Sequence, residues 1–543
     1  MLLVYRDVVK TVPTHACFDR IRRRIQAGDV IGALIIAGEL EQGVLDAVDA
    51  KTDDWTELHA TLRTMVLATA ALARGRGSAR ALFAACDAVR SRELPDTIAC
   101  RAPEGYCHYA LDPIAYAHAA ARYTGDGRIC DLVIAVRSIG TSLSAVVANT
   151  LNAPSVTVRA RGESGAREVI ASDRLMAHAL RQLERGGDVA IVDEGPGATG
   201  ETFHAVARWC GELGVDDNRI VLFPSHPGNS PLAPPDRRTW LDRAVRYPPP
   251  PEEKGRTAAE AAGFDCIVSI SAGQWRTHVS TGPRLPAACN FERTKYLGRR
   301  GGQWWHIRFA GAGEWGEDVL QRTCRLAERG CASRARALKH GFIALPWIDG
   351  APISRRSTRR EDGMQAAKYL QARLRLFPAD RPVPRGVFVR VLQEHALEAG
   401  LKPAAVAGAV KRIERLPQRE AFIGDARIAP HEWIRTRSGL LWKVDAVDHG
   451  DGFRLPGPAD AMWDCAGWLV EFGDPAVDLR QVFPDLSAED EAAAKAYAPA
   501  YAAVAFGDAL LSAREAANPR DRRILLSEAR FYRAALRSFL RAS

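Results

Sequence analysis

The stretch VAIVDEGPGATGETF, Val189 to Phe203, decides the fold. Four apolar residues run into two adjacent carboxylates, a Gly-rich turn follows, and Thr199 to Thr202 opens a helical pattern. An apolar run that ends in acids predicts a buried strand, and the turn after it offers backbone amides to a phosphate. The stretch therefore indicates a site for a phosphorylated sugar, and with it an enzyme.

Strands and helices alternate on both sides of this stretch. The run DLVIAV at 131–136 predicts a strand, and the segment SLSAVVANTL at 142–151 predicts the helix after it. Such alternation favours an α/β fold with a doubly wound parallel sheet. The other predicted strands are 156–158, 189–192 and 220–223, and the other predicted helices are 172–183 and 203–213.

The acid pair and the Thr-Gly turn resemble the phosphoribosyl-pyrophosphate signature of type I phosphoribosyltransferases. The resemblance implies that Asp193 and Glu194 form the catalytic pair on the ribose hydroxyls. It also implies a 5-phosphate loop of Thr199, Gly200, Glu201 and Thr202. The family usually has three residues between the acids and the Thr-Gly, whereas this chain has four, 195–198, so a longer or bulged loop is expected. The alternative is a generic strand-turn-helix with Gly and Pro in its turn.

A second loop upstream strengthens this resemblance. Residues 131–151 stand where the family places its diphosphate-binding strand and loop, and the reaction there depends on Mg²⁺ and phosphoribosyl pyrophosphate. The implied substrate-binding residues are Arg137, Ser138, Gly140 and Thr141. Candidates for a phosphate-covering loop, with plain surface arginines as the alternative, are Arg159, Arg161 and Arg167.

The C-terminal half carries a second set of acids, in the segments 424–433, 439–445 and 457–467. Their order resembles aminoglycoside-phosphotransferase-like kinases, whose catalytic loop reads His-Gly-Asp and ends Pro-Gly-Asn. The implied roles are catalytic base for Asp425, magnesium ligand for Asp445, and loop-supporting acid for Asp464. Glu432 or His431 stands where Asn would bind a second metal ion, and a carboxylate there can still hold magnesium.

The same resemblance assigns nucleotide-binding residues upstream. Arg308 in WWHIRF takes the place of the phosphate-binding lysine, Glu317 is its helix partner, and 345–350 links the two lobes of a bilobal α+β domain. ATP is then the implied cosubstrate. The chain departs from the family at Ile423, in place of the catalytic-loop His, and at Arg308, because arginine and lysine are not interchangeable at such a site. The alternative is an unrelated α+β domain with scattered acids.

Length and composition are consistent with several domains. A chain of 543 residues is too long for one core, and a Pro-rich run at 247–256 suggests a linker. Predicted elements of the second half include strands at 304–309 and 342–348 and an amphipathic helix at 524–541. The predicted division is a helical region at 1–95, the phosphoribosyltransferase-like domain at 96–245, a connecting segment at 246–290 and the kinase-like domain at 291–543.

The charge of the chain and its lack of long apolar runs bear on whether it binds nucleic acids or membranes. The net charge of +9 suits a phosphorylated substrate or a nucleic acid, but the arginines are dispersed along the chain, which favours a solvated surface. No apolar run approaches the roughly 20 residues that span a bilayer, and no signal peptide is evident, so a cytoplasmic protein without membrane contact is expected. The eleven cysteines show no metal-like spacing.

Three functions remain open from the sequence. The first is a magnesium-dependent phosphoribosyltransferase-like enzyme whose second half binds or phosphorylates a small molecule. The second is a regulatory protein that senses nucleotides or phosphosugars without turnover. The third is a small-molecule kinase with the first domain as a ligand-binding module.

Overall fold

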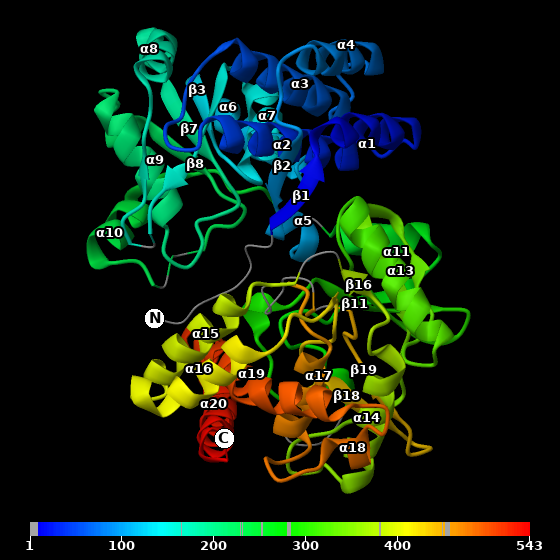
Figure 1. Cartoon of the computed structure of the whole chain (residues 1–543). Helices are drawn as coiled ribbons and strands as arrows, with labels where there is room; N and C mark the ends of the chain where they lie inside the picture. The colour runs from blue at the N-terminus through cyan, green and yellow to red at the C-terminus, as the bar shows by residue number, and fades with distance from the viewer. Residues whose placement is uncertain are drawn as a thin grey trace. The chain divides into compact units, whose positions relative to one another are not determined.

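The computed structural model divides into two compact units (Figure 1). The N-terminal unit comprises Val9–Glu253 with Ala312–Glu314, and the C-terminal unit comprises Lys254–Gly311 and Trp315–Ser543. The boundary at Glu253 falls in the predicted linker. The residues that the structure describes are 9–163, 165–228, 230, 232–250, 253–279, 284–379, 382–447, 449–450 and 457–542.

A five-stranded parallel sheet forms the centre of the N-terminal unit, so the predicted parallel sheet is present. Counted along the chain, its strands lie in the order 2-1-3-4-5, and the direction of winding reverses between the first and the third. The five strands in sheet order are β4 (Ser155–Val158), β3 (Cys130–Val136), β7 (Asp188–Val192), β8 (Ile220–Phe223) and β9 (Val245–Arg246).

Helices cover both faces of this sheet because its strands are apolar on both sides. Successive residues of a strand point to opposite faces, and accordingly Val133 and Ala190 join one core cluster while Leu132 and Ile191 join the other. The first cluster includes α6 (Ala115–Gly125) and α7 (Gly140–Leu151). The second includes α8 (Asp173–Gln182), α9 (Glu201–Glu212) and α10 (Pro235–Arg243).

The N-terminal helices share a core with the sheet, although the sequence suggests a separate region at 1–95. Residues 33–37 of α2 (Val30–Val48) are almost fully buried in the cluster that holds Val133 and Val192. An antiparallel pairing that the sequence does not predict joins β1 (Val9–Pro13) to β2 (Thr97–Arg101). The remaining helices of this part are α1 (Thr14–Gln26), α3 (Glu57–Ala73), α4 (Ala79–Arg90) and α5 (Glu104–His108).

A small antiparallel hairpin interrupts the connection between β4 and α8. It consists of β5 (Ala160–Arg161) and β6 (Glu168–Val169). The predicted covering loop with Arg159, Arg161 and Arg167 is thus an ordered hairpin in its described residues.

The C-terminal unit begins with a five-stranded antiparallel sheet. Residues 254–290, expected as a connecting segment, contribute a helix and the first strand to it. The strands in sheet order are β10 (Asp265–Ser269), β11 (Lys295–Arg300), β12 (Gln303–Phe309), β14 (Phe342–Pro346) and β13 (Arg336–Ala337). The helices of this part are α11 (Lys254–Ala261), α12 (Arg276–Val279) and α13 (Glu314–Glu328).

The rest of the C-terminal unit is mostly helical and shares one large core. No helix among the described residues combines the length and the apolar character needed to cross a membrane. The helices are α14 (Arg360–Arg373), α15 (Arg385–Glu398), α16 (Pro403–Arg415), α17 (Met462–Glu471), α18 (Leu479–Val482), α19 (Ala488–Glu515) and α20 (Pro519–Arg541). The short strands are β15 (Gly350–Pro352), β16 (Pro378–Ala379), β17 (Ala421–Phe422), β18 (Trp433–Thr436) and β19 (Leu441–Lys443).

Candidate functional site

The two phosphate loops predicted in the N-terminal unit lie side by side. They follow β3 and β7, which pair in parallel with Ala135 opposite Val192, so both loops leave the sheet at its carboxyl edge. At Gly140 the contact is so close that a Cβ atom would lie 2.7 Å from the carbonyl oxygen of Val192. This edge is also the point where the winding reverses, the usual ligand position in open α/β sheets.

Asp193 and Glu194 are fixed by hydrogen bonds from backbone amides. The amide of Glu194 donates to Oδ1 of Asp193 at 2.8 Å, and the amide of Gly105 donates to Oε2 of Glu194 at 3.0 Å. Burial raises the pKa of Asp193 to about 6. The acid pair is thus held rigidly at the loop edge, with one member easily protonated.

Arg137 has a different environment from the one expected of a diphosphate ligand. Its side chain is fully buried, and Nη2 lies 2.7 Å from Oδ2 of Asp49 and 2.8 Å from Oδ1 of Asp53. Its guanidinium is therefore neutralised by carboxylates. Thr141 is also fully buried, whereas Ser138 is half-buried with φ at 129°, in the left-handed region.

The loop of Thr199 to Thr202 leads into α9, as predicted. One of its residues, Glu201, contacts the β5–β6 hairpin. Gly200 adopts φ of 63°, which glycine allows without strain, and Thr199 and Thr202 are half-buried. Glu201 is buried, and its Oε1 accepts hydrogen bonds from the amides of Gly165, at 2.5 Å, and Arg167, at 3.1 Å. Glu201 thus connects the β5–β6 hairpin to the start of α9 through these two hydrogen bonds.

The hairpin arginines are paired with acids of the N-terminal helical part. Arg159 forms an ion pair with Asp46, and Nη2 of Arg161 lies 2.8 Å from Oδ1 of Asp53. Sequence reasoning missed these acids, since Asp46 and Asp53 are more than 100 residues away from the arginines they contact.

In the C-terminal unit, Asp464 supports the Asp425 loop as expected. Its two carboxylate oxygens, at the start of α17, accept hydrogen bonds from the amides of Asp425 and Ala426, both at 2.8 Å. Gly424 makes this approach possible, because a Cβ atom there would lie 2.7 Å from Oδ2 of Asp464. The loop position is therefore fixed by one carboxylate.

Asp425 itself is buried among donors. The hydroxyl of Tyr369 donates to Oδ2 at 2.6 Å, Nη1 of Arg373 lies 3.3 Å from the same oxygen, and Nζ of Lys443 lies 3.3 Å from Oδ1. Burial raises the pKa of Asp425 to about 6, although Lys443 and Arg373 oppose the rise. The predicted base thus has both oxygens engaged in this structure.

The β18–β19 hairpin places Glu432 beside Lys443. Trp433 is paired with Lys443, and the amide of Val444 donates to the carbonyl of Glu432 at 2.9 Å. Nζ of Lys443 lies 2.8 Å from Oε2 of Glu432, and Nε of Arg427 lies 2.8 Å from Oε1. Sequence reasoning missed this lysine, although it is two residues before Asp445.

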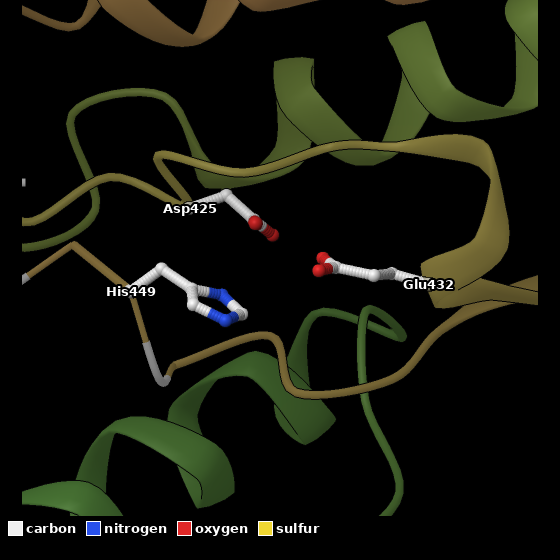
Figure 2. Close-up of side chains that lie close together, drawn as sticks. All are labelled: Asp425, Glu432 and His449. Carbon is white, nitrogen blue, oxygen red and sulfur yellow. The ribbon is translucent and has the colours of Figure 1, made fainter. Parts of the chain in front are cut away.

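His449 completes this cluster. One ligand atom from each of Asp425, Glu432 and His449 lies within 4.8 Å of the others, and all three residues are buried. Figure 2 shows the three side chains pointing toward a common centre. A histidine nitrogen and two carboxylates could hold a divalent cation, but the Lys443 ammonium already contacts both carboxylates.

Asp445 lies at the wall of a cavity of about 160 Å³. Burial alone would raise its pKa, but Lys295 and Arg308 outweigh this and hold the pKa well below its usual range. Nζ of Lys295 lies 3.8 Å from Oδ2 of Asp445. A permanently ionised carboxylate that is partly open to a cavity fits Mg²⁺, which prefers hard oxygen ligands. Besides Asp445 and Lys295, the polar lining includes Glu292, His306, Arg427, His431, Glu432 and His449.

Arg308 is not at this cavity. Its side chain is buried and lines a neighbouring cavity of about 80 Å³ with Asp445 and Lys443, whereas Glu317 is exposed on α13. Because Lys295 is paired with Arg308 across the β11–β12 ladder, it presents a cation one strand away from the predicted position. Lys295 was not identified from the sequence because β11, the strand that carries it, was not predicted.

The comparisons give similar proteins among solved structures only. No protein-family model and no curated protein sequence matches this chain. The chain is similar to choline kinase LicA from Streptococcus pneumoniae at 12% identity and a TM-score of 0.31, over 52% of this chain and 97% of that one. It is similar to a spectinomycin phosphotransferase complexed with ADP and spectinomycin at 9% identity and a TM-score of 0.33, over 53% and 96%. A third is an aminoglycoside phosphotransferase from Alicyclobacillus acidocaldarius, at 15% identity and a TM-score of 0.32, over 46% and 89%.

Proposed function

We propose that the C-terminal unit is a magnesium-dependent, kinase-like phosphotransferase that binds ATP and acts on a small molecule. The observation that carries this proposal is the pair of Asp445 and Lys295, which both line the cavity and lie 3.8 Å apart from Oδ2 to Nζ. An ionised carboxylate beside a lysine is the combination that holds a metal-bound polyphosphate.

The remainder of the cavity suits a nucleoside. Its apolar walls come from three parts of the unit, as expected of a pocket that encloses a flat ring. Ile270 follows β10, Trp347 follows β14, and Ile434 lies on β18. In the proposed mode the base lies between these side chains and the phosphates extend toward Lys295.

Each charged residue then has a role that its position allows. Asp445 would hold Mg²⁺, Lys295 would contact phosphate oxygens, and Asp464 fixes the loop that carries Asp425. A bound Mg²⁺ would neutralise charge on the transferred phosphate. Asp425 keeps the position of the base, but an acceptor hydroxyl would have to displace Tyr369 or Lys443 to reach it.

A thermal-shift experiment on the full chain tests this proposal. Millimolar ATP with Mg²⁺ should raise the melting temperature of the C-terminal unit by a few degrees, since a ligand at about 100 times its Kd adds about 2.7 kcal/mol. Asp445→Asn should abolish the rise, and Asp318→Asn, on the exposed side of α13, should keep it. An unchanged melting temperature of the wild-type protein would refute nucleotide binding.

The N-terminal unit is the basis of a second proposal, binding of phosphoribosyl pyrophosphate for phosphoribosyl transfer. The supporting observation is that the 137–141 and 193–200 loops adjoin at the point where the winding reverses. The 5-phosphate would lie against Thr199 to Thr202 and the diphosphate against the amides of 138–140. Arg137 would not contribute its guanidinium, because Asp49 and Asp53 hold it.

Calorimetric titration with phosphoribosyl pyrophosphate and Mg²⁺ tests the second proposal. The double variant Asp193→Asn, Glu194→Gln should lose binding, and Glu184→Gln, outside both loops, should retain it. Absence of binding to the wild-type chain would overturn the proposal. Binding of either ligand without turnover would instead favour the regulatory alternative.

A further inference from the structure

The ammonium group of Lys443 lies where three acceptors of the C-terminal site converge. Nζ contacts Oε2 of Glu432 at 2.8 Å, the carbonyl oxygen of Val444 at 2.9 Å and Oδ1 of Asp425 at 3.3 Å. Two of these contacts are hydrogen bonds, to Glu432 and to the Val444 carbonyl, and the contact with Asp425 is an ion pair. The side chain is fully buried, so water does not compete for these contacts.

This arrangement has the chemistry of a bound cation. Asp425 and Glu432 are positions where the kinase resemblance places the catalytic base and a ligand of a second metal ion. Two carboxylates contact the Lys443 ammonium in a fully buried position, which favours the charged form of the group. A divalent ion placed beside this ammonium would meet strong repulsion in a buried environment.

We propose that Lys443 is a built-in cation that replaces the second divalent metal ion of the site, so that the site takes one metal ion, at Asp445. This inference deepens the function proposed above, since it names the metal requirement of the same site. It predicts that removal of the ammonium group creates a new metal site from Asp425, Glu432 and His449, whose ligand atoms already lie within 4.8 Å of one another (Figure 2).

Manganese titration without any nucleotide tests the inference on the full chain, so the result does not depend on whether ATP binds. Free Mn²⁺ is followed by its electron paramagnetic resonance signal. Lys443→Met, of similar length but uncharged, should bind one more Mn²⁺ per chain than the wild type. The double variant Lys443→Met, Glu432→Gln should lose the additional ion. Lys411→Met, on α16, is the control and should bind as the wild type does.

Equal Mn²⁺ stoichiometry in the wild type and a folded Lys443→Met would overturn the inference. The variant also leaves two buried carboxylates without their lysine, so its fold needs a separate check. If Lys443→Met unfolds in metal-free buffer, millimolar Mn²⁺ should restore its circular dichroism spectrum. A variant that remains unfolded with Mn²⁺ would overturn the inference as well.

Discussion

The loop after β3 and the loop before β18 each bury one charged side chain among partners of the opposite sign. In the N-terminal unit, a cation, Arg137, lies between Asp49 and Asp53. In the C-terminal unit, an anion, Asp425, lies between Arg373 and Lys443.

In both units, a residue at a functional motif position forms buried ion pairs within the protein and serves the fold. A buried charge without its partner is costly, so the partners fix Arg137 and Asp425 in place and reduce their availability to a ligand. The polar groups that could contact a ligand are therefore the neighbours of Arg137 and Asp425. These are the amides of 138–140 in one unit, and Asp445 with Lys295 in the other.

Removal of Arg137 should have the largest effect. Arg137→Met leaves Asp49 and Asp53 buried with less compensation, and we expect the N-terminal unit to lose about 3–5 kcal/mol of unfolding free energy. Hydrogen exchange of the β3 amides in the full chain measures this loss for that unit alone. The control is Arg174→Ala, because the Arg174 side chain is exposed where it pairs with Asp54 and its removal should leave the unfolding free energy nearly unchanged. Equal exchange in the two variants would show that the buried ion pairs of Arg137 stabilise the N-terminal unit no more than a surface pair does.

Removal of the support under Asp425 should have the next largest effect. In Asp464→Asn, only one side-chain oxygen can still accept, so the amide of Asp425 or Ala426 loses its partner. A buried unpaired N–H costs about 1–3 kcal/mol. Chemical denaturation of the full chain, followed by hydrogen exchange at 424–426, should show this loss. Asp485→Asn, at the surface, should leave both measurements unchanged.

Asp193 should make the free energy of unfolding depend on pH. Its pKa is raised by burial to about 6 from 3.8, so the folded state binds the proton more tightly than the unfolded chain does. The free energy of unfolding should therefore fall as pH rises from about 4 to about 6, and stay low above that. Asp193→Asn should make this decline smaller, which urea denaturation across the range would measure. Asp425, whose pKa burial also raises to about 6, adds a decline of its own in both proteins. A decline of the same size in Asp193→Asn would contradict the assignment, and Asp87→Asn, exposed on α4, is the control.

The smallest effect is expected at the hairpin. Glu201→Gln keeps one acceptor for the amides of Gly165 and Arg167 but removes the charge, which should weaken the contact by about 1 kcal/mol. Amide exchange should become faster at those two residues while β7 is unaffected. Glu168→Gln, exposed on β6, should not change it. Unchanged exchange in Glu201→Gln would mean that the hairpin is held by other contacts.

Local patterns in the sequence predict much of this fold. The apolar runs at 131–136 and 189–192 are β3 and β7, and the glycines after them mark both loops of the N-terminal site. Asp464 was also predictable, since its role depends on its place in a motif. Each of these features is encoded within a few residues.

The partners of the charged residues could not be predicted, because they depend on distant parts of the chain. Arg137 is 88 residues from Asp49, and Tyr369 is 56 residues from Asp425. The contact of Lys443 with Glu432 requires the register of a hairpin, which the sequence alone does not specify. Sequence motifs thus locate a site, whereas the charge state of its residues depends on the tertiary structure.

Lys443 also affects how the C-terminal site responds to its surroundings. The occupancy of a bound metal ion follows the concentration of free metal and can be reversed by a chelator. A tethered ammonium has no dissociation equilibrium of this kind. The positive charge between Asp425 and Glu432 is therefore independent of the supply of divalent ions.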